Sequence, residues 1–305
     1  MSAKLGILWA LPSYAAAISS ELKKADVVHV RCPANIGLTA LVLVSLARRP
    51  AMRWVKYAGN WRPTGRESWS YACQRWWLRN RLHRGVVTVN GDWDDQPPHV
   101  FPFFNPCLTD AEVERGREGT LAKELRSPLR LLYVGRLDVS KGAGRAVQIW
   151  RRLREEGVGA ELDLIGDGPL RKKLADAGRV AGAEPHLRFH GWLSRQALEP
   201  FYAGAHIMLL PSASSEGWPK VLSEAMAFGV VPVAGRVSSI PGYLQQLGCG
   251  RAIDPEDIDG FVDAIRQYQN DEAAWRTESL AGCRAAPQFT YSRYRQAVKS
   301  LLAQP

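Results

Sequence analysis

The strongest constraint on the fold is an alternation of short apolar runs with helical stretches in the second half of the chain. The runs are Leu129–Val134, Leu162–Ile165, Leu187–Phe189, Ile207–Leu210 and Val230–Val233. They are continuously apolar, as strands buried on both faces are. Between them, Gly144–Glu156 and Leu170–Ala181 read as helices. The pattern predicts right-handed βαβ units and a parallel sheet covered on both faces.

The first third shows a weaker version of the same pattern. It predicts strands at Val27–Val30, Trp54–Tyr57 and Val86–Val89, and helices at Lys4–Lys24, Leu38–Ala47 and Trp69–Leu82. A chain of 305 residues has room for about two domains. Two facing domains of this kind bind ligands in the cleft at the carboxyl ends of their strands.

The boundary between the domains is expected near residue 125. The stretch Gly91–Ser127 is rich in Pro, Asp and Gly, and its prolines break regular structure. We therefore divide the chain into residues 1–125, residues 126–287 and a terminal helical segment, 288–305.

Positive charge is concentrated in the first third of the chain. Residues 1–91 hold 14 Lys and Arg but only three acids, which gives +11, whereas the whole chain carries +10 and the remainder therefore −1. This asymmetry favours a polyanionic neighbour, such as an anionic membrane, a nucleic acid or a phosphate-bearing substrate. A merely soluble basic surface is the plainer interpretation.

Other features limit location and metal chemistry. No apolar stretch is long enough to span a membrane, and the start lacks the parts of a signal peptide, so a cytoplasmic protein is expected. The five cysteines are odd in number and scattered, as in reduced thiols. No Cys and His cluster has zinc spacing, and no metal site or cofactor is predicted.

The loop Gly135–Gly142 is the first candidate for ligand chemistry. It follows a predicted strand and opens a helix, where backbone N–H groups and the helix dipole favour an anion. Arg136 and Lys141 are spaced to bracket a diphosphate. A pair of surface cations with no ligand explains these residues alone equally well.

Two further strand ends carry glycines. Gly166–Pro169 suits a tight turn into a helix, which is common in α/β proteins. In Phe189–Leu193, Gly191 would let a base or ribose approach the backbone. His190 is interpreted as structural rather than catalytic.

The segment Ser212–Gly229 gives the strongest signal. Glu216 lies in the loop before a helix and Glu224 lies inside it, so their carboxylates should be roughly 10–12 Å apart. A carboxylate pair acting on one glycosidic bond needs about 5–9.5 Å. The spacing suits two ends of one extended ligand, with the helix N-terminus between them for a phosphate.

These motifs resemble those of the family-4 retaining glycosyltransferases, which have the two-domain GT-B fold. The E-x7-E signature is Glu216 to Glu224 in EGWPKVLSEAMAFG, preceded in the family's order by GRLxxxKG at Gly135–Gly142, GxGP at Gly166–Pro169 and FxGxL at Phe189–Leu193. The resemblance runs from about Leu129 to Ile265. It implies two facing Rossmann-like domains, with the terminal helix crossing back to the first.

The resemblance also implies roles for individual residues. Arg136 and Lys141 would hold the donor diphosphate. Glu216, the expected catalytic residue, would hydrogen-bond hydroxyls of the transferred sugar, and Glu224 would accept from the ribose diol. The predicted donor-binding set is Gly135, Arg136, Lys141, Gly191, Leu193, Glu216, Gly217, Trp218, Pro219, Lys220 and Glu224. Segment 217–220 would contribute its backbone. The expected reaction is metal-independent, retaining transfer from a nucleotide-diphosphate sugar to a glycan or lipid-linked acceptor.

The first domain departs from the family pattern. Its Asp26–Arg31 strand resembles the family's mid-domain strand, so the opening strands are absent from the pattern. Truncation, an unusually small acceptor-side domain and supply by a partner subunit are the three explanations. The expected position of a catalytic His is Tyr57–Trp61, where Asn60 could partly substitute; His29 is interpreted as core.

Trp69, Cys73, Trp76 and Trp77 would share one face of a basic helix. Such a face can lie in a membrane interface or pack on its own domain, and packing is the favoured interpretation. Membrane docking remains a hypothesis, which would make the protein peripheral on the inner face of the membrane.

Other function classes are carried as alternatives. The runner-up is a non-catalytic sugar-nucleotide-binding subunit of a split or degenerate transferase. A sugar-nucleotide epimerase on the same fold is a further enzyme class. A nucleic-acid-binding role rests on the basic segment alone and is not expected.

Overall fold

A computed structural model describes residues 2–63, 67–93, 95–180, 185–214 and 217–303, with side chains from residue 9 onward. Contacts divide the chain into two compact units. Unit 1 comprises residues 1–104 and 297–305, and unit 2 comprises residues 105–296. The division lies between Phe104 and Asn105, whereas the sequence placed it near residue 125.

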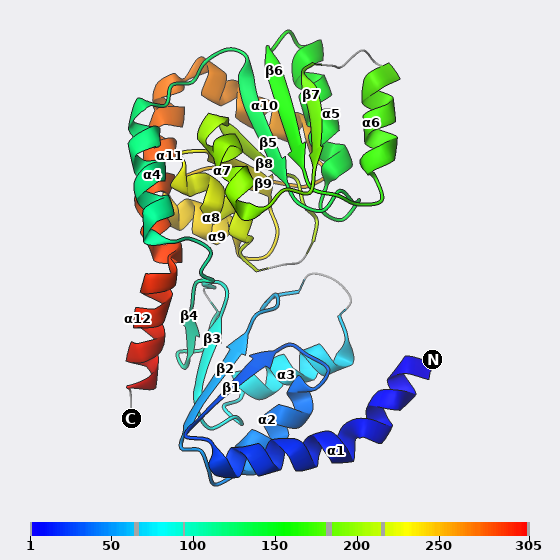
Figure 1. Cartoon of the computed structure of the whole chain (residues 1–305), viewed down its shortest axis with the longest axis vertical. Coiled ribbons are helices and arrows are strands. Elements are labelled where there is room, and N and C mark those ends of the chain that lie inside the picture. The colour runs from blue at the N-terminus through cyan, green and yellow to red at the C-terminus, as the bar shows by residue number, and fades with distance from the viewer. Residues whose placement is uncertain (1, 64–66, 94, 181–184, 215–216, 304–305) are drawn as a thin grey trace. The chain divides into compact units, whose positions relative to one another are not determined.

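Unit 1 is built on a four-stranded parallel sheet in the order β1-β2-β3-β4 (Figure 1). Its elements are α1 (Ser2–Lys24), β1 (Val27–Cys32), α2 (Gly37–Leu46), β2 (Met52–Tyr57), α3 (Trp69–Arg79), β3 (Val86–Val89) and β4 (Val100–Pro102). Buried residues such as Val30, Val55 and Val87 pack with Leu41 and Leu78 of α2 and α3. The expected strands and helices of this third are therefore present, with shifted ends.

The other face of β1 is open to solvent. Alternate residues Val27, His29 and Arg31 are exposed, because successive side chains of a strand point to opposite faces. The His29 ring lies against Trp54, with ring centroids 4.0 Å apart. The interpretation of His29 as a core residue is therefore wrong.

The Trp-rich helix α3 divides its aromatic residues between two surroundings. Trp77 packs against the core of unit 1 and its Nε1 donates to Ser45 Oγ at 3.2 Å. Trp69 and Trp76 lie on another side of the helix and are 76% and 56% exposed. The prediction that Trp77 shares the face of Trp69 is wrong, because positions 74, 77 and 78 form the inner stripe.

Unit 2 is a doubly wound α/β fold with helices on both sides of a six-stranded parallel sheet (Figure 1). Its strands are β5 (Leu129–Val134), β6 (Ala160–Ile165), β7 (Leu187–Gly191), β8 (Ile207–Leu210), β9 (Val231–Gly235) and β10 (Arg251–Ile253). Its helices are α4 (Asp110–Ala122), α5 (Ala143–Glu155), α6 (Arg171–Val180), α7 (Arg195–Gly204), α8 (Lys220–Ala227), α9 (Ile240–Leu247), α10 (Ile258–Asn270), α11 (Glu272–Ala285) and the 3-10 turn η1 (Ala286–Phe289). Helix α12 (Tyr291–Leu302) ends the chain, and its residues from 297 on are counted with unit 1.

The strand order β10-β9-β8-β5-β6-β7 fixes where a ligand can bind. The chain builds outward from β5 in one direction through β6 and β7, and from β8 in the other through β9 and β10. The connections therefore diverge between β5 and β8, and a crevice forms at the carboxyl ends of strands at such a switch point. The continuously apolar runs predicted five of the six strands, β5 to β9, whereas β10 was not predicted.

Helix α4 is an element that the sequence reading missed. The stretch 91–127 was expected to be irregular, but α4 forms within it. Thr109 and Glu112 make a capping box: Thr109 Oγ1 accepts from the Glu112 N–H at 3.2 Å, and Glu112 Oε2 accepts from the Thr109 N–H at 2.6 Å. The T-x-x-E spacing was the available signal. The helix packs on α8 and α11, which places it in unit 2.

Candidate donor-binding site

A cavity of about 160 Å³ lies at the switch point of unit 2. It receives Val134 and Gly135 from the end of β5, and Leu210 from the end of β8. Its lining also includes Lys141, Ser212, Gly217, Pro219 and Lys220. Five of the residues predicted to bind the donor are therefore brought together: Gly135, Lys141, Gly217, Pro219 and Lys220.

The loop between β5 and α5 holds Lys141 in place through its own hydrogen bonds. The Tyr133 hydroxyl donates to the Arg136 carbonyl at 2.9 Å and to the Lys141 carbonyl at 3.3 Å. Asp138 Oδ1 accepts from the Lys141 N–H at 2.8 Å and from the Ser140 hydroxyl at 2.9 Å. The Lys141 N–H, with the Ser140 hydroxyl and nearby cations, keeps the pKa of Asp138 below its ordinary value. The loop is thus preorganised around an ionised aspartate.

Gly142 lets this loop approach the end of β8. It has φ = +78°, and a Cβ there would lie 2.0 Å from the Pro211 carbonyl oxygen. Only glycine adopts this conformation and this contact without strain. The GRLxxxKG motif therefore ends in a glycine because any side chain there would collide with the Pro211 carbonyl oxygen.

The two cations of the loop differ in position. Lys141 lines the cavity, whereas the Arg136 side chain is 69% exposed and lies beside Asp138, with Nε 3.3 Å from Oδ2. A long exposed side chain can turn toward a bound anion without disturbing the backbone. In the structure as it stands, however, the two side chains do not bracket one space.

The start of α8 forms another wall of the cavity. Pro219 occupies the N-cap position in extended conformation, and its own side chain makes no capping hydrogen bond. Gly217, Pro219, Lys220 and Val221 face the cavity. A helix N-terminus offers backbone N–H groups and a positive dipole end to an anion. With Lys141 across from it, this wall gives the cavity the chemistry of a phosphate site.

Trp218 is not among the residues that line the cavity. Its side chain is 4% exposed, donates from Nε1 to Ser223 Oγ at 2.6 Å and stacks on Phe289. Its indole is therefore part of the core that positions the loop before α8. Glu216, the predicted catalytic residue, lies outside the described residues.

Glu224 lies in a second small hollow, one helical turn from Val221. It is bounded by Leu108, Glu112, Arg195, Glu199, Tyr202 and Phe228. Of the predicted donor-binding residues, Lys141 and Glu224 therefore line separate hollows. Val221 and Glu224 are three residues apart and therefore lie one above the other on the same side of α8, so the two hollows follow one another along the helix.

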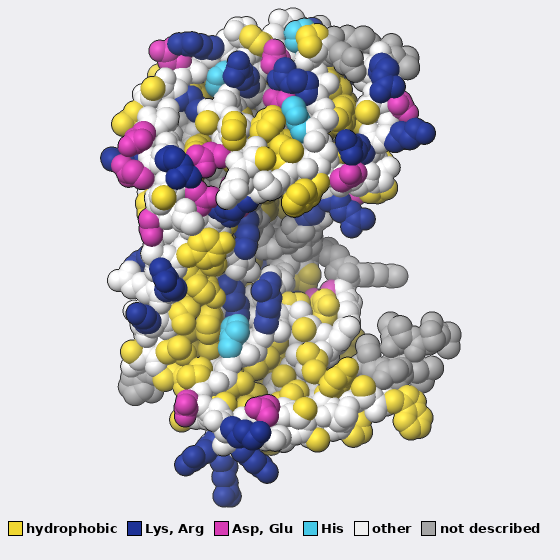
Figure 2. Space-filling view, viewed as in Figure 1, with side chains coloured by type: hydrophobic (Ala, Val, Ile, Leu, Met, Phe, Trp, Pro, Cys, Tyr) yellow, Lys and Arg dark blue, Asp and Glu magenta, His cyan; other side chains and the backbone are white. Residues whose placement is uncertain are grey.

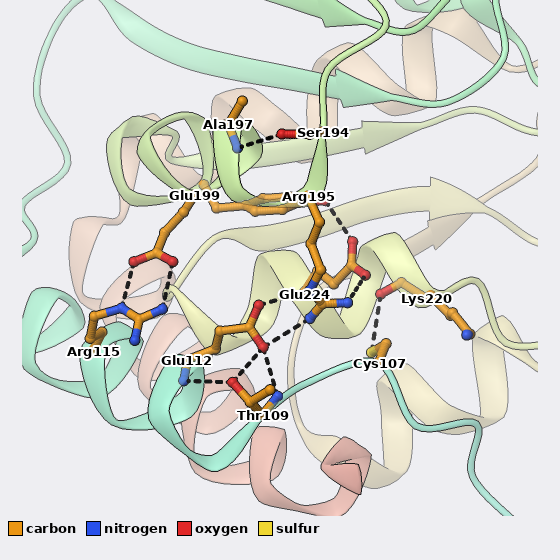
Figure 3. A network of polar contacts seen from close by, with 11 residues as sticks. Cys107, Thr109, Glu112, Arg115, Ser194, Arg195, Ala197, Glu199, Lys220 and Glu224 are labelled. Carbon is orange, nitrogen blue, oxygen red and sulfur yellow. Dashed lines mark hydrogen bonds and ion pairs between the residues drawn. The ribbon is translucent and has the colours of Figure 1, made fainter.

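A polar network holds Glu224 from both sides (Figure 3). Tyr202 donates its hydroxyl to Oε2 at 3.0 Å, and Arg195 Nη1 lies 3.3 Å from Oε1. Arg195 also pairs with Glu112, with Nε 2.8 Å from Oε1. Burial raises the pKa of Glu224 above its ordinary value, although Tyr202 and Arg195 act against this rise. The network leaves the carboxylate oriented and able to accept further hydrogen bonds.

Sequence reasoning missed Arg195, Tyr202 and Glu112. Only Glu112 had a visible signal, as the last residue of the capping box. Burial alone would raise the pKa of Glu112, but hydrogen bonds from Arg195 and Thr109 outweigh it and hold the pKa below its ordinary value. Arg195 is thus placed between two acids from two different helices.

The end of β7 lies next to the β5 and β6 loops. Gly191 is buried with φ = +72°, and its carbonyl accepts from the Gly166 N–H at 2.8 Å. Leu193 is half-buried and precedes the Ser194 cap of α7. His190 Nε2 lies 2.6 Å from Asp163 Oδ1, a structural contact at the sheet edge. Neither Gly191 nor Leu193 lines the cavity of Lys141.

The position expected for a catalytic His holds a structural asparagine. Asn60 is 8% exposed, and its Oδ1 accepts from the Arg62 N–H at 3.0 Å. Its side chain fixes the loop after β2.

Residues 122–282 match the family described as Glycosyl transferases group 1. The match covers more than half of the chain and includes both the β5–α5 loop and α8. The chain belongs to this family. Its fold is the GT-B type, as expected.

Individual proteins that are similar to this chain agree with its assignment to the family. The chain is 34% identical over 158 residues to the amylovoran biosynthesis glycosyltransferase AmsK of Erwinia amylovora, covering 50% of this chain and 39% of the relative. It is 28% identical over 217 residues to glycogen synthase of Mycobacterium tuberculosis, covering 69% and 51%. The chain thus spans about half the length, or less, of these relatives. The structure of Anabaena HepE in complex with UDP has a TM-score of 0.73 at 16% identity, covering 95% of this chain and 82% of that one.

Proposed function

We propose that the protein is a glycosyltransferase that uses a nucleotide-diphosphate sugar as donor. The observation that carries the proposal is the cavity at the β5–β8 switch point, which is lined by Lys141 and by the first residues of α8. These groups neutralise a diphosphate leaving group without a metal ion. HepE, which has the same fold, forms complexes with UDP and UDP-glucose.

In this proposal the donor extends across the first turns of α8. The diphosphate lies against Lys141 and the α8 N-terminus, with Arg136 turning in from solvent. Glu216 binds hydroxyls of the transferred sugar as the catalytic residue. Glu224, oriented by Tyr202, accepts from the ribose diol, and the backbone of Phe189–Leu193 receives the base. The spacing of Glu216 and Glu224 suits the two ends of one such ligand.

The proposed chemistry is transfer with retention of the anomeric configuration. The transition state resembles an oxocarbenium ion, and the leaving diphosphate helps to deprotonate the acceptor on the same face. The protein contributes positioning and electrostatic stabilisation. NMR of the product's anomeric proton tests this step; an inverted product would contradict it.

The acceptor is proposed to be a glycan or a lipid-linked glycan of a cell-envelope polysaccharide. AmsK is named for amylovoran biosynthesis, which is the kind of product that motivates this proposal. The basic first third fits a phosphate-bearing acceptor or an anionic membrane. We accordingly propose a cytoplasmic protein attached peripherally to the inner face of the membrane.

A donor screen tests the proposal. The melting temperature of the purified chain is measured with UDP, GDP, ADP and dTDP sugars, and transfer or hydrolysis of the best labelled donor is then assayed. The proposal expects one donor to raise the melting temperature and to be turned over. Binding without turnover would favour the non-catalytic subunit. Conversion of the donor to another sugar nucleotide without an acceptor would indicate an epimerase. If none of the nucleotide sugars raised the melting temperature, donor binding would be contradicted.

A further inference from the structure

Helix α1 presents an apolar surface that its own unit does not cover. Residues 5–20 contain no charged side chain. Trp9 is 86% exposed and Tyr14 is 43% exposed. Figure 1 shows the amino-terminal half of α1 projecting beyond the sheet of unit 1. A helix with so much apolar surface is normally buried against something, and the described part of unit 1 does not bury this one.

A groove lies at the carboxyl ends of α1 and α2. Its volume is about 510 Å³, and its apolar lining includes Leu22, Leu43 and Leu46. Leu46 is 76% exposed. The groove therefore adds a second exposed apolar region, at the end of α1 opposite to Trp9.

Cations border this groove. Lys23, Arg48 and Arg49 line it together with the apolar residues, and none of the three forms an ion pair with the described part of the chain. The neighbouring acid Glu21 is paired with Lys24 at 3.1 Å. Figure 2 shows Lys and Arg side chains gathered at the end of unit 1 where α1 and α2 lie. The rim thus carries a concentrated positive charge.

We propose that α1 and this groove form a docking surface for an anionic lipid bilayer. Trp9 and Tyr14 lie at the level of the lipid headgroups, and Lys23, Arg48 and Arg49 contact lipid phosphates while their stems cover the apolar groove. The inference rests on the proposed peripheral attachment and assigns it to α1 and α2 rather than to the Trp-bearing helix α3. Among the described residues, no helix is long and apolar enough to cross a membrane.

Charge decides between a bilayer and a second copy of the chain. The first third carries +11, so two copies meeting through this surface would bring like charges together. An anionic bilayer instead supplies both apolar volume and negative charge. Docking should therefore weaken at high salt, because exposed charges are screened.

Co-sedimentation of the full chain with vesicles tests the surface. Vesicles of phosphatidylcholine alone are compared with equal mixtures of phosphatidylcholine and phosphatidylglycerol. The double variant Arg48→Glu/Arg49→Glu should reduce the partition coefficient by at least about tenfold, since each basic residue near an anionic surface contributes separately. Trp9→Ser/Tyr14→Ser should also weaken binding. The matched control Lys172→Glu/Lys173→Glu makes the same charge change on exposed residues of α6 and should bind like wild type.

The possible results of the vesicle experiment distinguish failure of this docking surface from failure of membrane attachment or of donor binding. Unchanged binding of both surface variants, with loss in Trp69→Ser/Trp76→Ser, would overturn the assignment but leave peripheral attachment intact. Negligible binding of wild type to both vesicle types would overturn the surface and the attachment together, while donor binding would stand. A lipid-free dimer that Trp9→Ser/Tyr14→Ser abolishes would show that a second copy covers α1 instead.

Discussion

At the scale of single residues, the site separates residues that carry charge from residues that place it. Lys141 faces the cavity because Asp138 and Tyr133 fix the loop around it. Glu224 is placed by Tyr202 and Arg195. The motif spacing predicted Lys141 and Glu224 but not the residues that hold them. Arg195 and Tyr202, for example, reach Glu224 only because α7 packs near α8.

Lys141→Ala should weaken binding of the preferred nucleoside diphosphate by roughly 10- to 100-fold. The variant removes a charge-assisted hydrogen bond, typically about 1.5–3 kcal/mol, from a cavity wall. Isothermal titration calorimetry measures the change. Lys172→Ala, on the exposed side of α6, is the control and should leave the affinity unchanged. Equal affinities of wild type and Lys141→Ala would remove Lys141 from the donor site.

Tyr202→Phe should shift the pH dependence of donor binding. Burial already raises the pKa of Glu224 above its ordinary value, and the Tyr202 hydroxyl limits that rise. A ribose diol donates to the ionised carboxylate, so binding is complete above the pKa of Glu224 and is lost as the pH falls through it. Without the hydroxyl the pKa rises further, so the loss should begin at a higher pH.

This shift is measured as the affinity for a nucleotide sugar whose phosphates are both esterified, and so do not titrate in this range. Glu112 and Arg195 also face Glu224, but the pKa of Glu112 is lowered and Arg195 stays charged. Glu224→Gln provides the control, because it should abolish the pH-dependent step. The same midpoint in wild type and Tyr202→Phe would contradict the role given to Tyr202.

At the scale of elements, the sequence predicted the strands better than the segments between the units. Buried parallel strands are continuously apolar, so β5 and β8 were predicted with their observed ends. Helix α4 was missed because the prolines around it outweighed its capping box. The direction of the α8 side chains could not be predicted, since it depends on how α4 and α7 pack against α8.

Gly142→Ala should destabilise the fold by more than about 2 kcal/mol. The substitution forces a side chain into the left-handed region, and its Cβ would meet the Pro211 carbonyl. Gly144→Ala, two residues on in α5, is the matched control: nothing lies within 4 Å of its Cβ, so it should be neutral or stabilise by about 0.5–1 kcal/mol. Urea denaturation measures both. Similar unfolding free energies would show that the loop does not need the close contact.

Thr109→Ala should cost about 1 kcal/mol of stability through loss of the α4 cap. Thr109→Ser keeps the capping hydroxyl and should restore most of that loss. The same urea titrations compare the three proteins. If serine and alanine were equally destabilising, the hydroxyl would not be what stabilises the start of α4.

At the scale of the whole molecule, the chain divides its properties between two units. Unit 2 carries the family motifs and the switch-point cavity, whereas unit 1 carries the excess positive charge and the apolar groove of α1 and α2. The charge asymmetry was visible in the sequence because net charge needs no structure to be counted. The sequence did not show which basic residues border an apolar groove, because Lys23 and Arg49 come together only when α1 and α2 pack.

A crystal structure of the full chain with its preferred nucleotide sugar tests the central claim most directly. We predict that the diphosphate lies between Lys141 and the first turn of α8, with the ribose within hydrogen-bonding distance of Glu224. A diphosphate bound anywhere away from the β5–β8 switch point would contradict it.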